Sequence, residues 1–96
     1  MCWGTGMLNI VLSNHFKKDL KIISKRGCDL DLLNGVVEKL ARMEPLPAKN
    51  RDHNLTGDFI GFRECHIQPD WLLVYRTDDE NLILFLSRTG THSDLF

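Results

Sequence analysis

Histidine, aspartate and arginine residues at short spacings mark the second half of the 96-residue sequence. The stretch "HIQPDW" places Asp70 four residues after His66, across a proline turn, and "RTGTH" places Arg88 four residues before His92. His53 lies in "DHNLTG". Histidine and aspartate exchange protons near neutral pH when their surroundings are tuned, and the arginine fork matches phosphate oxygens. These side chains could together cleave a phosphoester.

RNA suits this set of side chains because it carries its own nucleophile, the 2′-hydroxyl. Cleavage then needs a base for the hydroxyl proton, an acid for the leaving 5′-oxygen and a cation for the phosphate charge. Trp71, or Phe96 at the end of the sequence, could stack on a splayed base. This chemistry requires no metal, and we expect no cofactor. Spacing alone does not distinguish RNA from a small phosphoester.

Each of these residues also has a purely structural interpretation. Asp70 follows a proline and could simply form a turn through its side chain. Trp71 could belong to the core, and Arg88 could be a surface ion-pair partner. A histidine in a small domain is usually a surface or hydrogen-bonded structural residue, which is how we interpret His15 and, taken alone, also His53. The tail "THSDLF" could be an element that docks on the core.

Composition and charge fit a single small domain. The chain is 43% hydrophobic and 26% charged, as in ordinary globular proteins. No apolar run approaches the ~18 residues of a membrane span, and the first residues do not resemble a secretory signal. We therefore expect a cytoplasmic protein that binds no membrane. A net charge of −1 argues against strong general affinity for nucleic acid, although residues 13–27 carry five Lys/Arg against one Asp.

The cysteines and the start of the chain carry little functional signal. Three cysteines without CxxC spacing predict neither a disulfide framework nor a cysteine-based metal site. Residues 1–6, "MCWGTG", have little periodicity, and we interpret them as an N-terminal extension or a cloning remnant. The predicted domain then spans residues 7–96.

The first half of the domain predicts a strand followed by two helices. The apolar, partly β-branched run at residues 8–12 indicates a strand. Apolar residues at helical spacing follow Ser13 and Asn14, either of which can cap a helix, and Gly27 ends this first helix. Asp29 caps a second amphipathic helix, which the prolines of "EPLP" end.

The second half predicts a short strand and turn at residues 53–57 and strands at residues 59–67, 71–77 and 82–87, and short connections make the last three an antiparallel meander. The expected fold class is therefore α+β: a small single domain with β-α-α-β-β-β(-β) order. Its two N-terminal helices pack on one face of an antiparallel sheet, which leaves the other face open for a ligand. The meander should also bring five candidate side chains to one edge of the sheet: His66, Asp70, Trp71, Arg88 and His92.

Three blocks, "DHNLTG", "GFRECHIQPDW" and "RTGTHSDLF", occur in this order and closely resemble the YafQ branch of the RelE-type toxins of bacterial type II toxin–antitoxin systems. The resemblance runs from about Leu8 to Phe96. It implies a RelE-like fold and a ribosome-dependent endoribonuclease, an mRNA interferase, that cuts the codon in the A site. It also implies a cognate DinJ-like antitoxin that blocks the toxin, with operator DNA reached only through the antitoxin complex.

Carried over residue by residue, the resemblance assigns roles to the candidates. His92 would be the leading proton-transfer residue, most readily the general acid. Asp70 would be the base, with His66 as a rival for that role. His53 would assist proton transfer or grip phosphate, and Arg88 would stabilise the charged phosphate.

The resemblance further implies that Trp71 and Phe96 position bases or shape the pocket.

Two other classes of function remain open. One is a toxin of the same superfamily fold that acts on DNA gyrase, which does not need the histidines and aspartate. The other is a metal-binding or pure interaction module with His53, His66 and His92 as ligands. Their wide separation in sequence lacks the paired spacing usual in zinc signatures.

Overall fold

A computed structural model describes residues 7–95, so the predicted extension at 1–6 and the predicted role of Phe96 lie outside the described residues. The domain is α+β, as predicted from the sequence. The elements follow in chain order: β1 (Asn9–Leu12), α1 (Asn14–Lys25), α2 (Leu30–Ala41), the 3₁₀ turn η1 (Ala48–Asn50), β2 (His53–Asn54), the 3₁₀ turn η2 (Gly57–Phe59), β3 (Arg63–Gln68), β4 (Trp71–Asp78), β5 (Ile83–Gly90) and α3 (His92–Leu95).

Both long helices begin at the caps that the sequence indicates, but α2 ends at Ala41, before the prolines that were expected to end it. Ser13 caps α1, because its Oγ accepts a hydrogen bond from the Phe16 amide at 2.9 Å. Asp29 caps α2 by accepting from the Asp31 amide at 3.0 Å. Gly27, with φ +80°, turns the chain between the helices. Within residues 7–95, no helix combines the length and the apolar character needed to cross a membrane.

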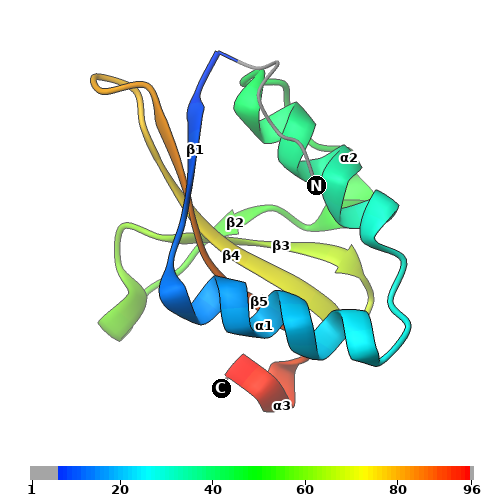
Figure 1. The fold of residues 1–96 in the computed structure, drawn as a ribbon. Helices are drawn as coiled ribbons and strands as arrows, with labels where there is room; N and C mark the ends of the chain where they lie inside the picture. Colours follow the sequence, from blue (N-terminus) through cyan, green and yellow to red (C-terminus); the bar gives the residue numbers. More distant parts are fainter. Residues whose placement is uncertain (1–6, 96) are drawn as a thin grey trace.

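The sheet has five strands in the order β1-β5-β4-β3-β2 (Figure 1). The predicted antiparallel meander of β3, β4 and β5 is confirmed by the pairing of these strands. β1, however, pairs with β5 in parallel, so the sheet is mixed rather than wholly antiparallel. The two helices that follow β1 allow the last strand to return beside the first, and a periodicity pattern cannot predict that pairing.

The strand predicted at residues 59–67 begins only at Arg63. Gly57 and Gly61 adopt φ values of +65° and +92°, which side-chain-bearing residues rarely adopt. The segment between them therefore turns, first as η2, instead of extending into the sheet. The apolar residues of this segment, which suggested a strand, are exposed: Phe59 and Ile60.

The strand predicted at residues 82–87 is longer than expected. β5 continues to Gly90, so Arg88 lies inside the strand and not after it. Beyond Gly90 the chain forms the short helix α3, which carries His92. α3 therefore lies beside the sheet near α1 (Figure 1).

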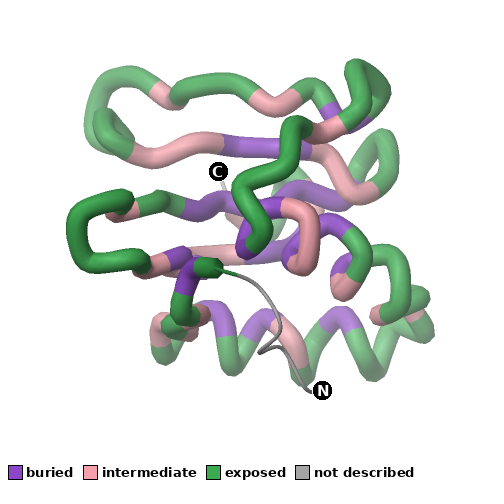
Figure 2. Tube along the Cα trace, turned by 90° about the horizontal axis from the view of Figure 1, so that it is seen from above, coloured by how far each residue is buried: buried purple, intermediate pink, exposed green. Residues whose placement is uncertain are grey.

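Both long helices contribute to one core, on one face of the sheet, as predicted. Figure 2 shows buried stretches along the strands and on the helices, separated by exposed loops. The core side chains with 2% exposure or less include Phe16, Ile23, Leu33 and Val37 from the helices and Cys65, Leu73, Tyr75, Leu84 and Leu86 from the strands. Leu72 and Val74 are also buried but lie outside this cluster. Alternate residues of a strand face opposite sides, so these two belong to the face without helices.

Candidate active site

A row of side chains crosses the face of the sheet that α1 and α2 leave open. The strand register places His53 opposite Glu64, Glu64 opposite Val74, and Val74 opposite Arg88. Residues directly opposite each other in neighbouring strands project to the same face. With strands ~4.8 Å apart, the backbones of Glu64 and Arg88 lie roughly 10 Å apart on either side of the buried Val74. On this face of the sheet, the apolar Val74 therefore lies between the polar residues Glu64 and Arg88.

The next row brings two imidazoles together. His66 lies opposite Leu72, which lies opposite Gly90 on β5. After Gly90 the chain turns into α3, and His92 approaches His66 with 6.1 Å between the ring centroids. Two histidines that are 26 positions apart in sequence therefore face one another across the end of β4.

Asp70 joins this pair from the β3–β4 turn. Its Oδ1 accepts a long hydrogen bond, 3.4 Å, from the backbone amide of His92 and lies 3.5 Å from the Nδ1 of the same residue. Both side chains are open to solvent, with exposed fractions of 72% for Asp70 and 58% for His92. The structure thus brings together His66, Asp70 and His92, at the end of the sheet where the sequence predicted a common edge.

Glu64 is a site residue that the sequence reading missed. It is buried, and its Oε1 lies 3.5 Å from the Nε2 of His53 and 3.9 Å from the Nε2 of His66. The Nδ1 atoms of the two histidines face the carbonyls of Arg51 and Pro69, at 2.6 and 3.2 Å. A carbonyl only accepts, so each Nδ1 carries a proton in these contacts. Strand alternation, which places residues 64 and 66 on one face, was the available signal.

Buried polar contacts fix the segments that carry His53 and His66. The Asn50 side chain donates to the His66 carbonyl at 2.7 Å from a buried position. Asp52 accepts hydrogen bonds from the Tyr75 hydroxyl and from Arg63 in β3, which ties the start of β2 to the sheet. Burial is the first cause that raises the pKa of Tyr75 above its usual range, followed by the hydrogen bond to Asp52. The hydroxyl therefore stays a donor.

Arg88 is held by a carboxylate from α1. Asp19, only 6% exposed, accepts from Arg88 Nε at 2.7 Å and from Nη2 at 3.2 Å. The same carboxylate accepts from the Thr89 amide at the edge of β5, at 3.1 Å. The hydrogen bond from Asp19 raises the pKa of Arg88 further above its usual range. Asp19 thus fixes one edge of the guanidinium, and the Arg88 side chain is still 30% exposed.

Trp71 lies in the core and not on the surface. It is 4% exposed, and its indole Nε1 donates to Thr89 Oγ1 at 2.9 Å. Thr89 in turn donates to the Leu72 carbonyl at 2.7 Å. The structural interpretation of this residue therefore fits better than base stacking, because the ring has almost no exposed face. Of the roles expected for Trp71, shaping the pocket is the one that its position supports.

Two hollows flank the β3–β4 turn and share Gln68 and Pro69. The larger, with a volume of about 580 Å³, lies between His66, Lys49 and Arg51. The smaller, about 380 Å³, is lined by Asp70, Trp71, Gly90, Thr91 and the basic Arg26 at the end of α1. The larger hollow combines His66 with the cations of Lys49 and Arg51, which suits an anionic ligand. In the smaller one, Arg26 is paired with Asp94 at 2.6 Å, so its charge is already balanced.

The arrangement of histidines, cysteines and carboxylates tests the alternative that this domain binds a metal ion. Among residues 7–95, no three or more histidines, cysteines and carboxylates are grouped so that they could hold a metal ion. His53, His66 and His92 therefore do not form a three-ligand metal site in this structure. Cys28 and Cys65 are both free thiols.

The fold and the cluster define a small α+β domain with histidines and carboxylates on the sheet face that its helices leave open. Residues 8–96 match the family model described as "Bacterial toxin of type II toxin-antitoxin system, YafQ". The chain belongs to this family of toxins, and the resemblance found in the sequence motifs is confirmed.

Relatives and solved structures agree with this assignment. The mRNA interferase toxin YafQ of Escherichia coli K12 is 39% identical over 89 residues, which cover 92% of this chain and 95% of that protein. A metal-bound toxin from Helicobacter pylori has a TM-score of 0.89 at 52% identity, covering 94% of this chain and all of that one. The toxin in the E. coli DinJ-YafQ complex has a TM-score of 0.85 at 38% identity, covering 94% and 98%.

Proposed function

We propose that this chain is an endoribonuclease, an mRNA interferase that cuts mRNA codons in the ribosomal A site. Its curated E. coli relative carries the name mRNA interferase toxin. The observation that carries the proposal is the pair of imidazoles, His66 and His92, with ring centroids 6.1 Å apart and carboxylates beside each. Such a pair can serve one phosphodiester as base and acid without moving.

The reaction begins with the base taking the proton of the 2′-hydroxyl. The freed oxygen attacks phosphorus, the bond to the 5′-oxygen breaks, and a 2′,3′-cyclic phosphate forms. His66 suits the role of base, because its Nδ1–H faces the Pro69 carbonyl, and Glu64 Oε1, 3.9 Å from Nε2, would stabilise the imidazolium that forms when Nε2 takes the proton. Asp70, the earlier candidate, remains the rival, since its carboxylate is solvent-exposed and reaches the same space.

His92 suits the role of acid for the leaving 5′-oxygen. Its Nδ1 faces Asp70, so Nε2 is the nitrogen that gives the proton. Asp70 then acts as the group that orients His92 and stabilises the imidazolium before proton transfer. His53, beside Glu64, would assist proton transfer or grip a neighbouring phosphate.

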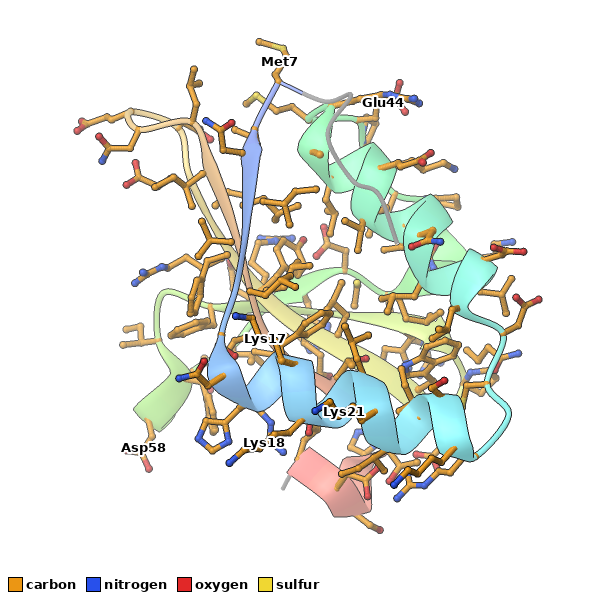
Figure 3. The ribbon with its side chains drawn as sticks, in the orientation of Figure 1. Met7, Lys17, Lys18, Lys21, Glu44 and Asp58 are labelled. Carbon is orange, nitrogen blue, oxygen red and sulfur yellow. The ribbon has the colours of Figure 1, made fainter. Side chains whose placement is uncertain are left out.

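Cations around the cluster would stabilise the phosphate charge and bind the RNA backbone. Arg88 is held by Asp19 through Nε and Nη2 and would offer its Nη1 to the phosphate. Lys17, Lys18 and Lys21 project from α1, the helix beside α3 (Figure 3). They would attract the sugar–phosphate backbone of the ribosomal complex, although the whole chain has a net charge of −1.

The partners follow from the same family assignment. The E. coli toxin forms a complex with DinJ. By analogy, this chain would bind a cognate DinJ-like antitoxin, reach operator DNA only through that complex, and act in the cytoplasm on the ribosome and its mRNA.

The proposed chemistry needs no metal, because the substrate supplies the nucleophile and side chains move both protons. One related toxin from H. pylori is metal-bound. Adding EDTA, with magnesium restored to keep ribosomes intact, to a translation-coupled cleavage assay should leave the rate unchanged. A loss that zinc or copper reverses would overturn metal independence.

His92→Ala is the central test of the proposed function. We expect codon cleavage to fall by about 10²–10⁴-fold and growth arrest to disappear, because the acid is lost. Folding, by circular dichroism, and antitoxin binding should be retained, since His92 is exposed. His15→Ala, an exposed histidine at the start of α1, is the matched control and should act like wild type.

Mapping mRNA 5′ ends after induction separates the classes of toxin. Cuts in frame within particular codons support the proposal and identify the codon. Trapped or nicked DNA without such cuts would support action on gyrase instead. If His92→Ala cleaves mRNA at the wild-type rate, His92 is not the general acid.

A further inference from the structure

The segment that carries His92 has few apolar anchors of its own. α3 comprises only four residues, His92–Leu95, and none of them is buried. The contacts of His92 with Asp70 are long, at 3.4 and 3.5 Å, and both side chains are mostly in solvent. Polar contacts that fix α3 therefore also help to set the position of the His92 imidazole.

Asp94 provides one set of these contacts, within α3 itself. Its Oδ2 accepts from the Thr91 amide at 2.9 Å, while its own amide donates to Thr91 Oγ1 at 3.2 Å. This is the reciprocal pattern of a capping box, with the acid three residues after the threonine. His92 lies between the two residues, so the same contacts set its backbone.

Arg26, at the end of α1, connects this turn to the rest of the fold. Its Nη1 lies 2.6 Å from Asp94 Oδ2, and its Nη2 lies 3.0 Å from Asp94 Oδ1, a two-point contact across 68 residues of sequence. Arg26 is the C-cap residue of α1, so its backbone is fixed by that helix. A parallel fork of this kind fixes direction as well as distance.

Gly90 shows how closely Asp94 approaches the end of β5. A Cβ on Gly90 would lie 2.8 Å from Asp94 Oδ2, closer than real Cβ atoms approach a neighbour, and the φ of Gly90 is +153°. The carboxylate therefore occupies the space that a side chain at Gly90 would need. Asp94 is thus held between the strand, the turn and α1.

We propose that Arg26 is a positioning residue for RNA cleavage, which acts through Asp94 to fix the direction of the His92 imidazole. The proposal rests on the proposed role of His92. An exposed ion pair adds little to global stability, and the Arg26 side chain is 46% exposed. Its effect should therefore appear in the geometry of α3. Misplacement of a reacting group by about 1 Å can cost about 10²-fold in rate.

The kinetic test uses Arg26→Ala, Asp94→Asn and the double variant in translation-coupled cleavage. Asp94→Asn keeps an oxygen for the Thr91 amide but loses the charge that Arg26 binds. We expect kcat to fall by about 10–100-fold in each single variant, with KM and Tm unchanged. Because the two residues act as one unit, the double variant should be no slower than Arg26→Ala. Arg26→Lys should recover part of kcat.

Arg42→Ala is the matched control. Arg42 is also an exposed C-cap arginine, at the end of α2, and should keep wild-type kcat. A rise in KM with unchanged kcat, or additive losses in the double variant, would show that Arg26 binds RNA directly and would overturn the proposal.

A second measurement tests the positioning without activity. The hydrogen bond from Arg26 is the first cause that holds the pKa of Asp94 below its usual range. In Arg26→Ala, NMR titration of the Asp94 carboxyl should show this pKa raised towards its ordinary value, and the His92 ring signals should shift. Unchanged signals would overturn the proposal. If these changes occur but His92→Ala still cleaves RNA, the positioning stands and the proposed role of His92 fails.

Discussion

Replacing Asp19 by asparagine tests how Arg88 is held on the open face. The Asp19 carboxylate accepts from Arg88 Nε at 2.7 Å, from Arg88 Nη2 at 3.2 Å and from the Thr89 amide at 3.1 Å. Asparagine has nearly the same shape, and its one oxygen can keep the contacts that Oδ2 makes. Its NH₂ group then faces the Nη2 donor, so the variant loses the charge and one hydrogen bond.

The size of the effect follows from these contacts. A hydrogen bond between charged groups contributes about 1.5–3 kcal/mol, so we expect Asp19→Asn to lower the free energy of unfolding by about 2 kcal/mol. Asp19→Ala also leaves the buried Thr89 amide without its acceptor. Breaking such a pair costs about 3–5 kcal/mol, and the 30% exposure of the Arg88 side chain places this case near the lower end. In a domain of this size, about 2 kcal/mol corresponds to a fall in Tm of about 8–16 °C.

Thermal and guanidinium unfolding, followed by circular dichroism, measure both variants. Asp58→Asn, the same chemical change at an exposed position (Figure 3), should stay within about 0.5 kcal/mol of wild type. Cleavage by Asp19→Asn at a temperature where it is folded should also slow, because Arg88 is no longer oriented. If Asp19→Asn unfolds at the same temperature and guanidinium concentration as Asp58→Asn, the Asp19 carboxylate does not anchor Arg88 and the reasoning fails.

Other changes test the core around the site. Trp71→Phe should lower the free energy of unfolding by more than about 1 kcal/mol, through the lost bond to Thr89 and the space that the smaller ring leaves, without raising KM, as measured by chemical denaturation and cleavage kinetics. Gly90→Ala should reduce cleavage and unfold more easily, because its Cβ meets Asp94; wild-type behaviour would contradict that contact. Burial raises the pKa of the Cys65 thiol to about 12, so iodoacetamide at pH 8 should modify it only in the denatured protein. Above pH 9 the unfolded thiol ionises first, so stability should fall as pH rises towards 12.

Local sequence signals predicted the structure correctly wherever a single residue type sets the backbone conformation. Ser13 and Asp29 cap helices because their side-chain oxygens accept the first orphan amides, and Gly27 turns the chain at positive φ. Predictions that rested on apolar content alone were less accurate. The segment before Arg63 looked like strand, yet its glycines make it turn.

Long-range contacts placed the residues that the sequence reading missed. Asp19 holds a buried position on α1, and only the return of β5 beside that helix gives it Arg88 as a partner. Glu64 shares a face with His66 by alternation, but its position beside His53 depends on the pairing of β2 with β3. Arg26 and Asp94 are 68 residues apart and meet only because α3 folds back onto α1.

By itself, the sequence determined the two helices, the antiparallel meander, the set of histidines and aspartate, and the family to which the chain belongs. Capping, periodicity and motif order are local properties, so a reading along the chain can find them. The tertiary structure decided the parallel pairing of β1 with β5, the burial of Trp71, and the carboxylates that hold His53, Arg88 and α3. These features depend on which distant segments pack together. The packing is set by the free energy of the whole chain and not by any local stretch of sequence.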